Sequence, residues 1–132
     1  MGTDNGRAKN AVKNGQGAAS IADKVAPHSI EAEAACLGGI HTNPGYLAQV
    51  RLILNGPDDF FLLRNNYVYA GMLAVADRGE ELDTLTLSEE LRAQGRLDAV
   101  GGSAYLVRLG LDTPTSAHTL SYAGVVRRLS RK

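Results

Sequence analysis

Three histidines and one cysteine are the side chains in this sequence best suited to binding a metal ion. They are His28, Cys36, His41 and His118. A structural zinc site needs three or four such ligands, and sequences usually bring them together as Cys-x-x-Cys pairs or as histidines one helical turn apart. None of these spacings occurs, so we expect no metal site. The single cysteine cannot form an internal disulfide, and its alanine and leucine neighbours indicate a buried, inert thiol.

Nucleotide binding and acid–base catalysis also lack the residues that they need. A P-loop places a lysine directly after its last glycine, and no lysine of this chain follows a glycine. Paired carboxylates occur at Asp58-Asp59, Glu80-Glu81 and Glu89-Glu90. They stand beside predicted turns or on solvent-facing helix positions, where burial does not shift a pKa toward catalysis. We therefore expect no catalytic residue and no cofactor, and we interpret the chain as a binding or assembly module rather than an enzyme.

Length and composition limit what such a module can be. The chain has 132 residues and balances 14 basic against 14 acidic side chains, which allows one domain. It contains no run of about 18 apolar residues and no signal peptide, so we expect a cytoplasmic protein without membrane contact. Residues 1–26 carry few large apolar side chains and are predicted to form a flexible tail before a domain at 27–132.

The first predicted helix follows Ser29, which is a good N-cap residue. Glu31 and Glu33 then lie in its first turn, where the helix dipole favours acidic side chains. An apolar stripe runs along this helix, which should end near Gly38-Gly39 or near Thr42.

Further helices are predicted from the same kind of signals. They follow Asn43-Pro44, precede Asp77-Arg78-Gly79, follow Asp83 or Thr84, follow Gly101-Gly102-Ser103 with the serine as cap, and follow Thr113-Pro114-Thr115-Ser116. Phe60 and Phe61 lie in a turn, and we expect both rings to plug the core. No strand pair with hairpin chemistry is present. The fold class is therefore all-α, a compact bundle of about six short helices.

Eight short runs of residues follow one protein family's order and spacing. They are Pro27-His28-Ser29-Ile30-Glu31-Ala32-Glu33, Leu37-Gly38, Asp59-Phe60-Phe61, Ala74-Val75-Ala76-Asp77-Arg78-Gly79, Leu82-Asp83-Thr84-Leu85-Thr86-Leu87, Gly101-Gly102-Ser103-Ala104-Tyr105-Leu106, Thr113-Pro114-Thr115 and Tyr122-Ala123-Gly124-Val125-Val126. In this order they resemble the N-terminal domain of the DnaB-type replicative DNA helicases. The resemblance covers residues 27 to about 130.

The resemblance implies a function in DNA replication and primosome formation. In that family the domain forms a collar on a ring-shaped hexamer, pairs with its neighbours through a following helical hairpin, and docks primase and, in some systems, a helicase loader. It performs no catalysis by itself, because ATP and magnesium are used in a separate RecA-like motor domain that this chain lacks. In the full-length context we expect a homo-oligomer, as a dimer or a hexameric collar.

Two matched positions coincide with family positions implicated in primase docking, namely Glu31 and Tyr105. Each also has a purely structural interpretation. Glu31 could serve only the helix dipole, and Tyr105 could be a core residue whose hydroxyl reaches solvent. Three residues of the last helix, Tyr122, Val126 and Leu129, are candidates for contacts with the hairpin or for assembly.

The chain also departs from the family. The family usually carries a histidine where this chain has Asn65, and an asparagine keeps one donor and one acceptor group but loses the ring. Such changes suggest a divergent member from a phage or mobile element. The sequence given ends where the hairpin would start, so a free-standing adaptor that binds a primase or helicase is the alternative function. Direct DNA binding through the basic cluster at 127–132 is not expected, because these residues also complement the helix dipole.

Overall fold

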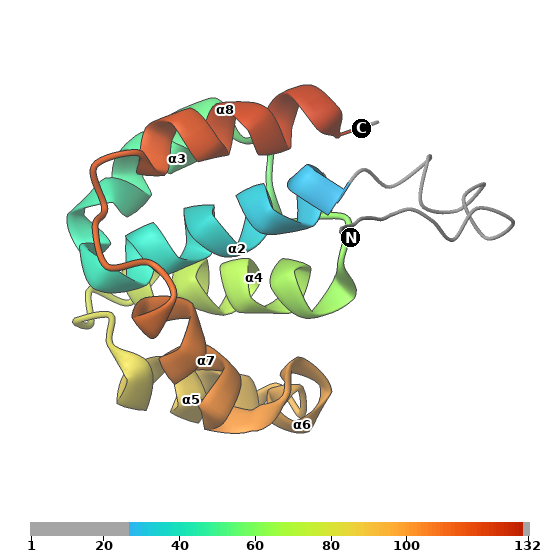
Figure 1. Ribbon diagram of the computed structural model, residues 1–132. Coiled ribbons are helices and arrows are strands. Elements are labelled where there is room, and N and C mark those ends of the chain that lie inside the picture. The colour runs from blue at the N-terminus through green and yellow to red at the C-terminus, as the bar shows by residue number, and fades with distance from the viewer. Residues whose placement is uncertain (1–26, 131–132) are drawn as a thin grey trace, which may run out of the picture.

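The computed structural model describes residues 27–130, and within this range it contains α-helices and 3-10 helices but no strand (Figure 1). The helices are α2 (Pro27–Thr42), η1 (Pro44–Tyr46), α3 (Leu47–Ile53), η2 (Pro57–Asp59), α4 (Leu63–Asp77), α5 (Thr84–Ala93), α6 (Leu97–Val100), α7 (Gly102–Leu111) and α8 (Thr119–Leu129). The predicted all-α class is confirmed. The predicted tail at 1–26 and the last two residues lie outside the described range.

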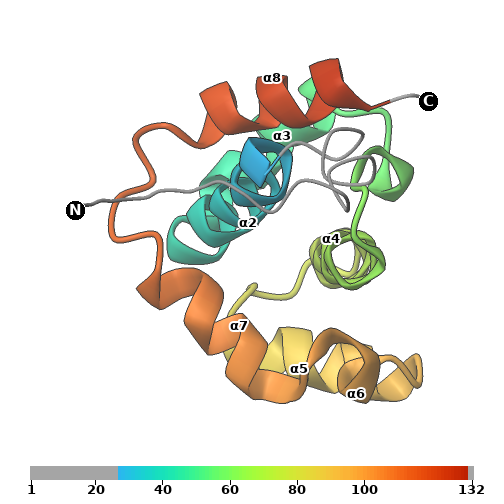
Figure 2. The ribbon, with the colours of Figure 1, turned by 45° about the vertical axis from the view of Figure 1, so that its right-hand side comes forward.

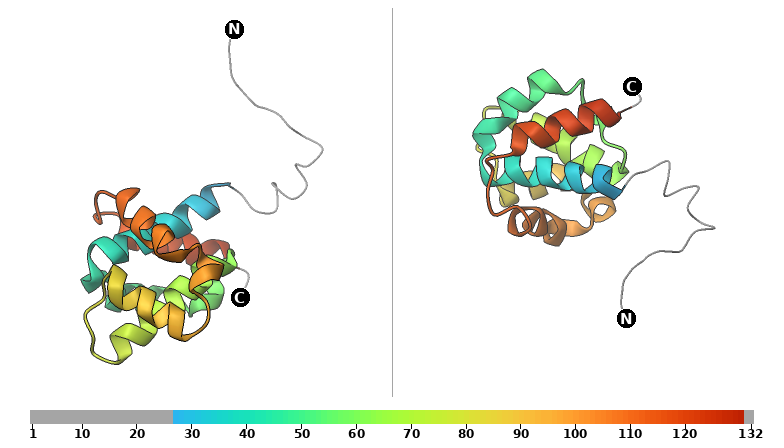
Figure 3. Two further views of the ribbon diagram at one scale, coloured as in Figure 1. Left: turned by 90° about the horizontal axis from the view of Figure 1, so that it is seen from below. Right: turned by 45° about the horizontal axis from the view of Figure 1, so that its top comes forward.

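Helix α2 is the centre of the fold and packs against α8, α7 and α4. Figures 1 and 2 show α8 and α3 on one side of α2, with α4, α5 and α7 on the other. Helix α8 runs antiparallel to α2, so the start of α2 and the end of α8 lie at the same end of the domain (Figure 3). Within residues 27–130, no helix is long and apolar enough to cross a membrane.

Two glycines inside α2 allow this close packing. A Cβ atom on Gly38 would lie 2.2 Å from Thr113 Oγ1 and 2.4 Å from the Leu109 carbonyl oxygen. A Cβ atom on Gly39 would lie 1.9 Å from Thr119 Oγ1. The glycines therefore bring the end of α7 and the start of α8 against α2. Of the two predicted ends of this helix, Thr42 is correct.

The core is built from aliphatic side chains and one buried tyrosine, Tyr69. Cys36 is fully buried as predicted, and burial raises the pKa of its thiol to about 12. Phe60 is also buried, and its ring lies 5.2 Å from that of Tyr69. Phe61 is 62% exposed, so the prediction that both phenylalanines plug the core is wrong for this residue. The backbone at Phe60 is extended, and adjacent side chains of an extended backbone point to opposite sides. Phe60 therefore faces the core and Phe61 faces away from it.

The helix starts confirm the predicted caps at Asn43 and Asp83 and correct two others. Asp83 caps α5, because its carboxylate accepts the Thr86 N–H at 2.8 Å while the Thr86 hydroxyl interacts with the Asp83 N–H at 3.0 Å. Helix α2 already begins at Pro27, so Ser29 lies inside it. Ser103 also lies inside its helix, and its hydroxyl contacts that of Ser88 at 2.9 Å instead of capping.

Candidate docking surface around Tyr105

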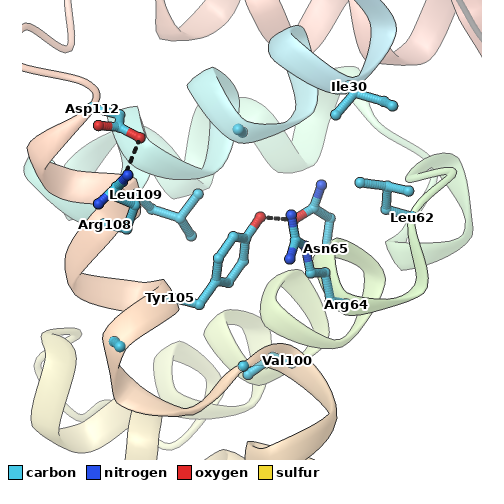
Figure 4. Close-up of a pocket in the computed structure, with 12 residues that line it drawn as sticks. Ile30, Leu62, Arg64, Asn65, Val100, Tyr105, Arg108, Leu109 and Asp112 are labelled. Atoms are coloured by element: carbon cyan, nitrogen blue, oxygen red, sulfur yellow. Dashed lines mark hydrogen bonds and ion pairs between the residues drawn. The ribbon is translucent and has the colours of Figure 1, made fainter. Parts of the chain in front are cut away.

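A hollow of about 530 Å³ opens between α2, the start of α4 and α7 (Figure 4). We call it the Tyr105 hollow; its lining residues are Ile30, Ala34, Leu62, Arg64, Asn65, Val100, Gly101, Ala104, Tyr105, Arg108, Leu109 and Asp112. Six of these twelve residues are aliphatic, and the polar side chains come from the start of α4, from α7 and from the residue that follows α7. A recess with apolar walls and a few convergent polar groups is the usual form of a binding site.

Tyr105 joins the two sides of this hollow. Its side chain is half-buried and packs against the core, and its hydroxyl donates a hydrogen bond to Asn65 Oδ1. The Arg64 guanidinium carbon lies 4.3 Å from the centre of the tyrosine ring, which is a cation–π contact. Burial raises the pKa of the Tyr105 hydroxyl, and Arg64 acts in the opposite direction. Tyr105 is thus both a packed residue and a lining residue of the hollow.

A buried acid on α2 holds this arrangement in place. Glu33 is 2% exposed, and its carboxylate accepts hydrogen bonds from the Phe61 N–H, from the Leu62 N–H at 3.3 Å and from Asn65 Nδ2 at 2.9 Å. The two backbone donors lie just before α4, where helix N–H groups have no partner within the helix. The pKa of Glu33 is raised above its ordinary value, because the effect of burial exceeds the opposite effect of its three hydrogen bonds.

The sequence prediction missed this role of Glu33. It placed the residue in the first turn, where an acidic side chain complements the helix dipole, but α2 begins earlier and Glu33 faces α4. The spacing of Glu33 from Ile30 and Leu37 puts it on the apolar stripe of α2, and that signal could have indicated burial. Asn65 is fully buried and uses the two groups that an asparagine offers, a donor toward Glu33 and an acceptor toward Tyr105.

The two predicted docking residues lie at different places. Tyr105 lines the hollow, whereas Glu31 is exposed and is not among the lining residues. The residue before it in α2, Ile30, does line the hollow, so Glu31 lies next to the edge of the hollow. The structure therefore places an exposed acid beside the region of α2 that borders the hollow, without contact to Tyr105.

The candidates on α8 divide into exposed and buried residues. Tyr122 and Leu129 are 37% and 38% exposed, and Val126 is 4% exposed and part of the core. Only the first two thus offer accessible apolar area. In the described part of the chain, no group of three His, Cys, Asp or Glu side chains could hold a metal ion.

Comparison with known proteins decides the family. The sequence model described as "DnaB-like helicase N terminal domain" matches residues 25–128. The chain belongs to this family. The resemblance found in the eight sequence runs is therefore confirmed, and the hollow described above is a feature of a DnaB-type N-terminal domain.

Two replicative DNA helicases are similar in sequence to most of this chain. The chain is 38% identical over 110 residues to the replicative DNA helicase DnaB of Geobacillus stearothermophilus, which covers 83% of this chain and 24% of the relative. It is 38% identical over 108 residues to the replicative DNA helicase DnaC of Bacillus subtilis, covering 82% of this chain and 24% of the relative. The chain thus spans about a quarter of the curated relatives that it matches.

A solved structure shares the fold. The N-terminal domain of DnaB helicase from Mycobacterium tuberculosis superposes with a TM-score of 0.73 at 34% sequence identity. The match covers 76% of this chain and 69% of that one.

Proposed function

We propose that this chain acts in DNA replication as the assembly and docking domain of a replicative helicase, and that it binds primase through the Tyr105 hollow. It does so without a cofactor and without catalysis of its own. The membership in the DnaB N-terminal family is the observation that carries the proposal, because the matched relatives are replicative DNA helicases by name. The chemistry of the hollow supports its assignment as the docking surface.

The hollow has the properties of a protein docking site. Half-buried tyrosines with an apolar ring and a polar tip contribute strongly to protein interfaces, as do arginines beside them. Tyr105 and Arg64 form such a pair, and Ile30, Leu62 and Leu109 supply the apolar wall around it. A partner segment that enters the hollow would bury this wall and reach the tyrosine hydroxyl.

Glu31 would act at the rim of the same surface. An exposed charge at the edge of an interface changes the association rate and its salt dependence more than the final affinity. We therefore assign Glu31 to steering a partner toward α2, and Tyr105 to holding it.

Titration of the full chain with the primase of the same organism tests this proposal. We expect Tyr105→Phe to weaken binding about tenfold, and Glu31→Ala to slow association several-fold in low salt only. Tyr67→Phe and Glu89→Ala are matched controls, because Tyr67 also carries an arginine over its ring at 4.2 Å and Glu89 is an exposed acid on α5. No binding, or equal binding by all variants, would contradict the proposal.

The exposed apolar residues of α8 support a second part of the proposal, which is assembly. Tyr122 and Leu129 would pack against the segment that follows the domain or against another copy of it. Replacing both by serine should lower the oligomeric mass of the full-length protein in light scattering. An unchanged mass would contradict this assignment. Adding the helicase loader of the same organism to the unmodified protein tests loader binding in the same way, by an increase in mass.

A further inference from the structure

The hydrogen bonds that lead from α2 to the Tyr105 hollow have a fixed direction. Both carboxyl oxygens of Glu33 act as acceptors: Oε2 accepts from the Phe61 N–H, and Oε1 accepts from the Leu62 N–H and from Asn65 Nδ2. Asn65 must therefore turn its NH₂ group toward Glu33, because the reverse orientation would place two acceptor oxygens face to face. This leaves Oδ1 of Asn65 toward Tyr105.

The orientation of Asn65 in turn fixes the hydroxyl of Tyr105. A tyrosine hydroxyl has one proton, and here that proton is donated to Asn65 Oδ1. Figure 4 shows the hydroxyl pointing across the hollow toward Asn65. Arg64 also interacts with this hydroxyl and acts to lower its pKa, so what Tyr105 then offers to an incoming group is the remaining lone pair of its oxygen. The hollow thus presents an acceptor at this point.

The charges around the hollow limit which donor can approach. Arg64 covers the ring of Tyr105, and Arg108 lines the same hollow. Arg108 is paired with Asp112 at 3.3 Å, whereas Arg64 has no carboxylate within ion-pair distance among the described residues. A second cation beside Arg64 would be repelled, so a neutral hydroxyl or amide N–H fits best.

We infer that Glu33, although it lies behind the surface, is a specificity-determining residue of the docking site: through Asn65 it makes Tyr105 an acceptor. The partner segment therefore presents a neutral hydrogen-bond donor to Tyr105, next to an apolar side chain that packs on Ile30 and Leu62. This inference rests on the proposed docking role of the hollow and adds to it the chemistry of the partner.

The polarity of Tyr105 can be reversed in the full chain by replacing Tyr105 with 4-aminophenylalanine. An aryl amine has two N–H donors, so one can bond Asn65 while the other points into the hollow. With the primase of the same organism as probe, we expect this variant to bind about tenfold more weakly than the unmodified chain. Binding as tight as that of the unmodified chain would mean that the partner presents an acceptor, and it would overturn the inference.

A double-mutant cycle tests the part assigned to Glu33. Glutamine has nearly the same shape but also donates, so in Glu33→Gln the amide of Asn65 is no longer held in one orientation. We expect Glu33→Gln to weaken primase binding about tenfold when Tyr105 is present and less than about twofold in Tyr105→Phe. If Glu33→Gln weakens binding by the same factor with and without the Tyr105 hydroxyl, the two residues act independently. Glu33 would then have a merely structural role, and the assignment would be overturned.

Controls separate folding, docking and specificity. Glu89→Gln and Tyr67→Phe should bind like the unmodified chain, and circular dichroism melting checks that every variant is folded at the temperature of the titration. The 4-aminophenylalanine variant retains Glu33 and therefore keeps the test valid if Glu33→Gln does not fold. No binding by the unmodified chain contradicts the proposed function itself. Binding that Tyr105→Phe weakens but 4-aminophenylalanine restores contradicts only the donor assignment.

Discussion

Asp59 accepts a hydrogen bond from Ser130 at the end of α8, although the two residues are 71 positions apart in the sequence. The distance from Ser130 Oγ to Asp59 Oδ1 is 2.7 Å, and the other carboxylate oxygen accepts the Asn55 N–H at 2.7 Å. Asp59 is only 4% exposed. One buried carboxylate therefore joins the end of the last helix to the turn that precedes α4.

Asp59→Ala should destabilise the domain much more than the same change at its neighbour. The substitution removes the acceptor for two hydrogen bonds to a charged group, and we expect a loss of about 3 kcal/mol in the free energy of unfolding. Asp58 is exposed and has one bond to Asn66 at 3.1 Å, so Asp58→Ala should change stability by less than about 0.5 kcal/mol. Urea denaturation of both variants measures the difference. Equal losses would mean that Asp59 does not join these segments.

The two acids of α2 give a second matched pair. Glu33→Ala leaves three N–H groups without an acceptor in the interior, and we expect a loss of about 3 kcal/mol or more. Glu31 is exposed, so Glu31→Ala should stay within about 0.5 kcal/mol of the unmodified chain. Thermal melts of both variants under one buffer condition check this. A stable Glu33→Ala variant would contradict the capping role assigned to Glu33.

Most of the helices could be predicted from local features of the sequence. Helix existence follows from local caps and periodic apolar residues: α4 ends at the predicted Asp77-Arg78-Gly79, and α5 begins after the predicted Asp83. The four residues of α6 are too few to show a period, so this helix was not predicted. The all-α class and the family could therefore be predicted, while the shortest α-helix of the described residues could not.

The candidate site was harder to predict, because its contacts join distant parts of the chain. Tyr105 could be identified from a motif, but its bond to Asn65 spans 40 positions and that of Asn65 to Glu33 spans 32. Glutamate is also a common first-turn residue, so local reasoning assigned Glu33 to the dipole. Which acid of Glu31 and Glu33 is buried follows from the spacing to the apolar residues of α2, and Glu33 rather than Glu31 shares a helix face with Ile30 and Leu37.

Two glycines in different environments test the packing of α2. Gly38→Ala places a methyl group against the Leu109 backbone oxygen at 2.4 Å, and backbone cannot give way as a flexible side chain can. We expect a loss of about 3 kcal/mol or more. Gly124 lies in α8 with no atom within 4 Å of the added Cβ, so Gly124→Ala should gain about 0.5 to 1 kcal/mol from helix propensity. Urea denaturation distinguishes the two, and a neutral Gly38→Ala would refute the close approach of α7.

The thiol of Cys36 should report on unfolding. It is fully buried, and burial raises its pKa to about 12, so the reactive thiolate is almost absent in the folded domain. We expect labelling by a disulfide reagent to be slow in buffer and to accelerate in proportion to the unfolded fraction as urea is added. Rapid labelling of the folded chain would show that the region around Cys36 opens locally.

As the pH rises, the unmodified chain should lose stability relative to Glu33→Gln. Burial raises the pKa of Glu33 above its ordinary value of 4.5, so ionising this residue costs more in the folded than in the unfolded chain. Its contribution to stability is then fully present below that value and is lost as the pH rises through the folded-state pKa. Asp83 and Glu90 have lowered pKa values and act in the opposite direction, but they are common to both proteins. The stability of Glu33→Gln relative to the unmodified chain should therefore increase as the pH rises above the ordinary value of 4.5, as measured by urea denaturation over a pH series. A constant or falling difference would mean that the three N–H donors outweigh burial at Glu33.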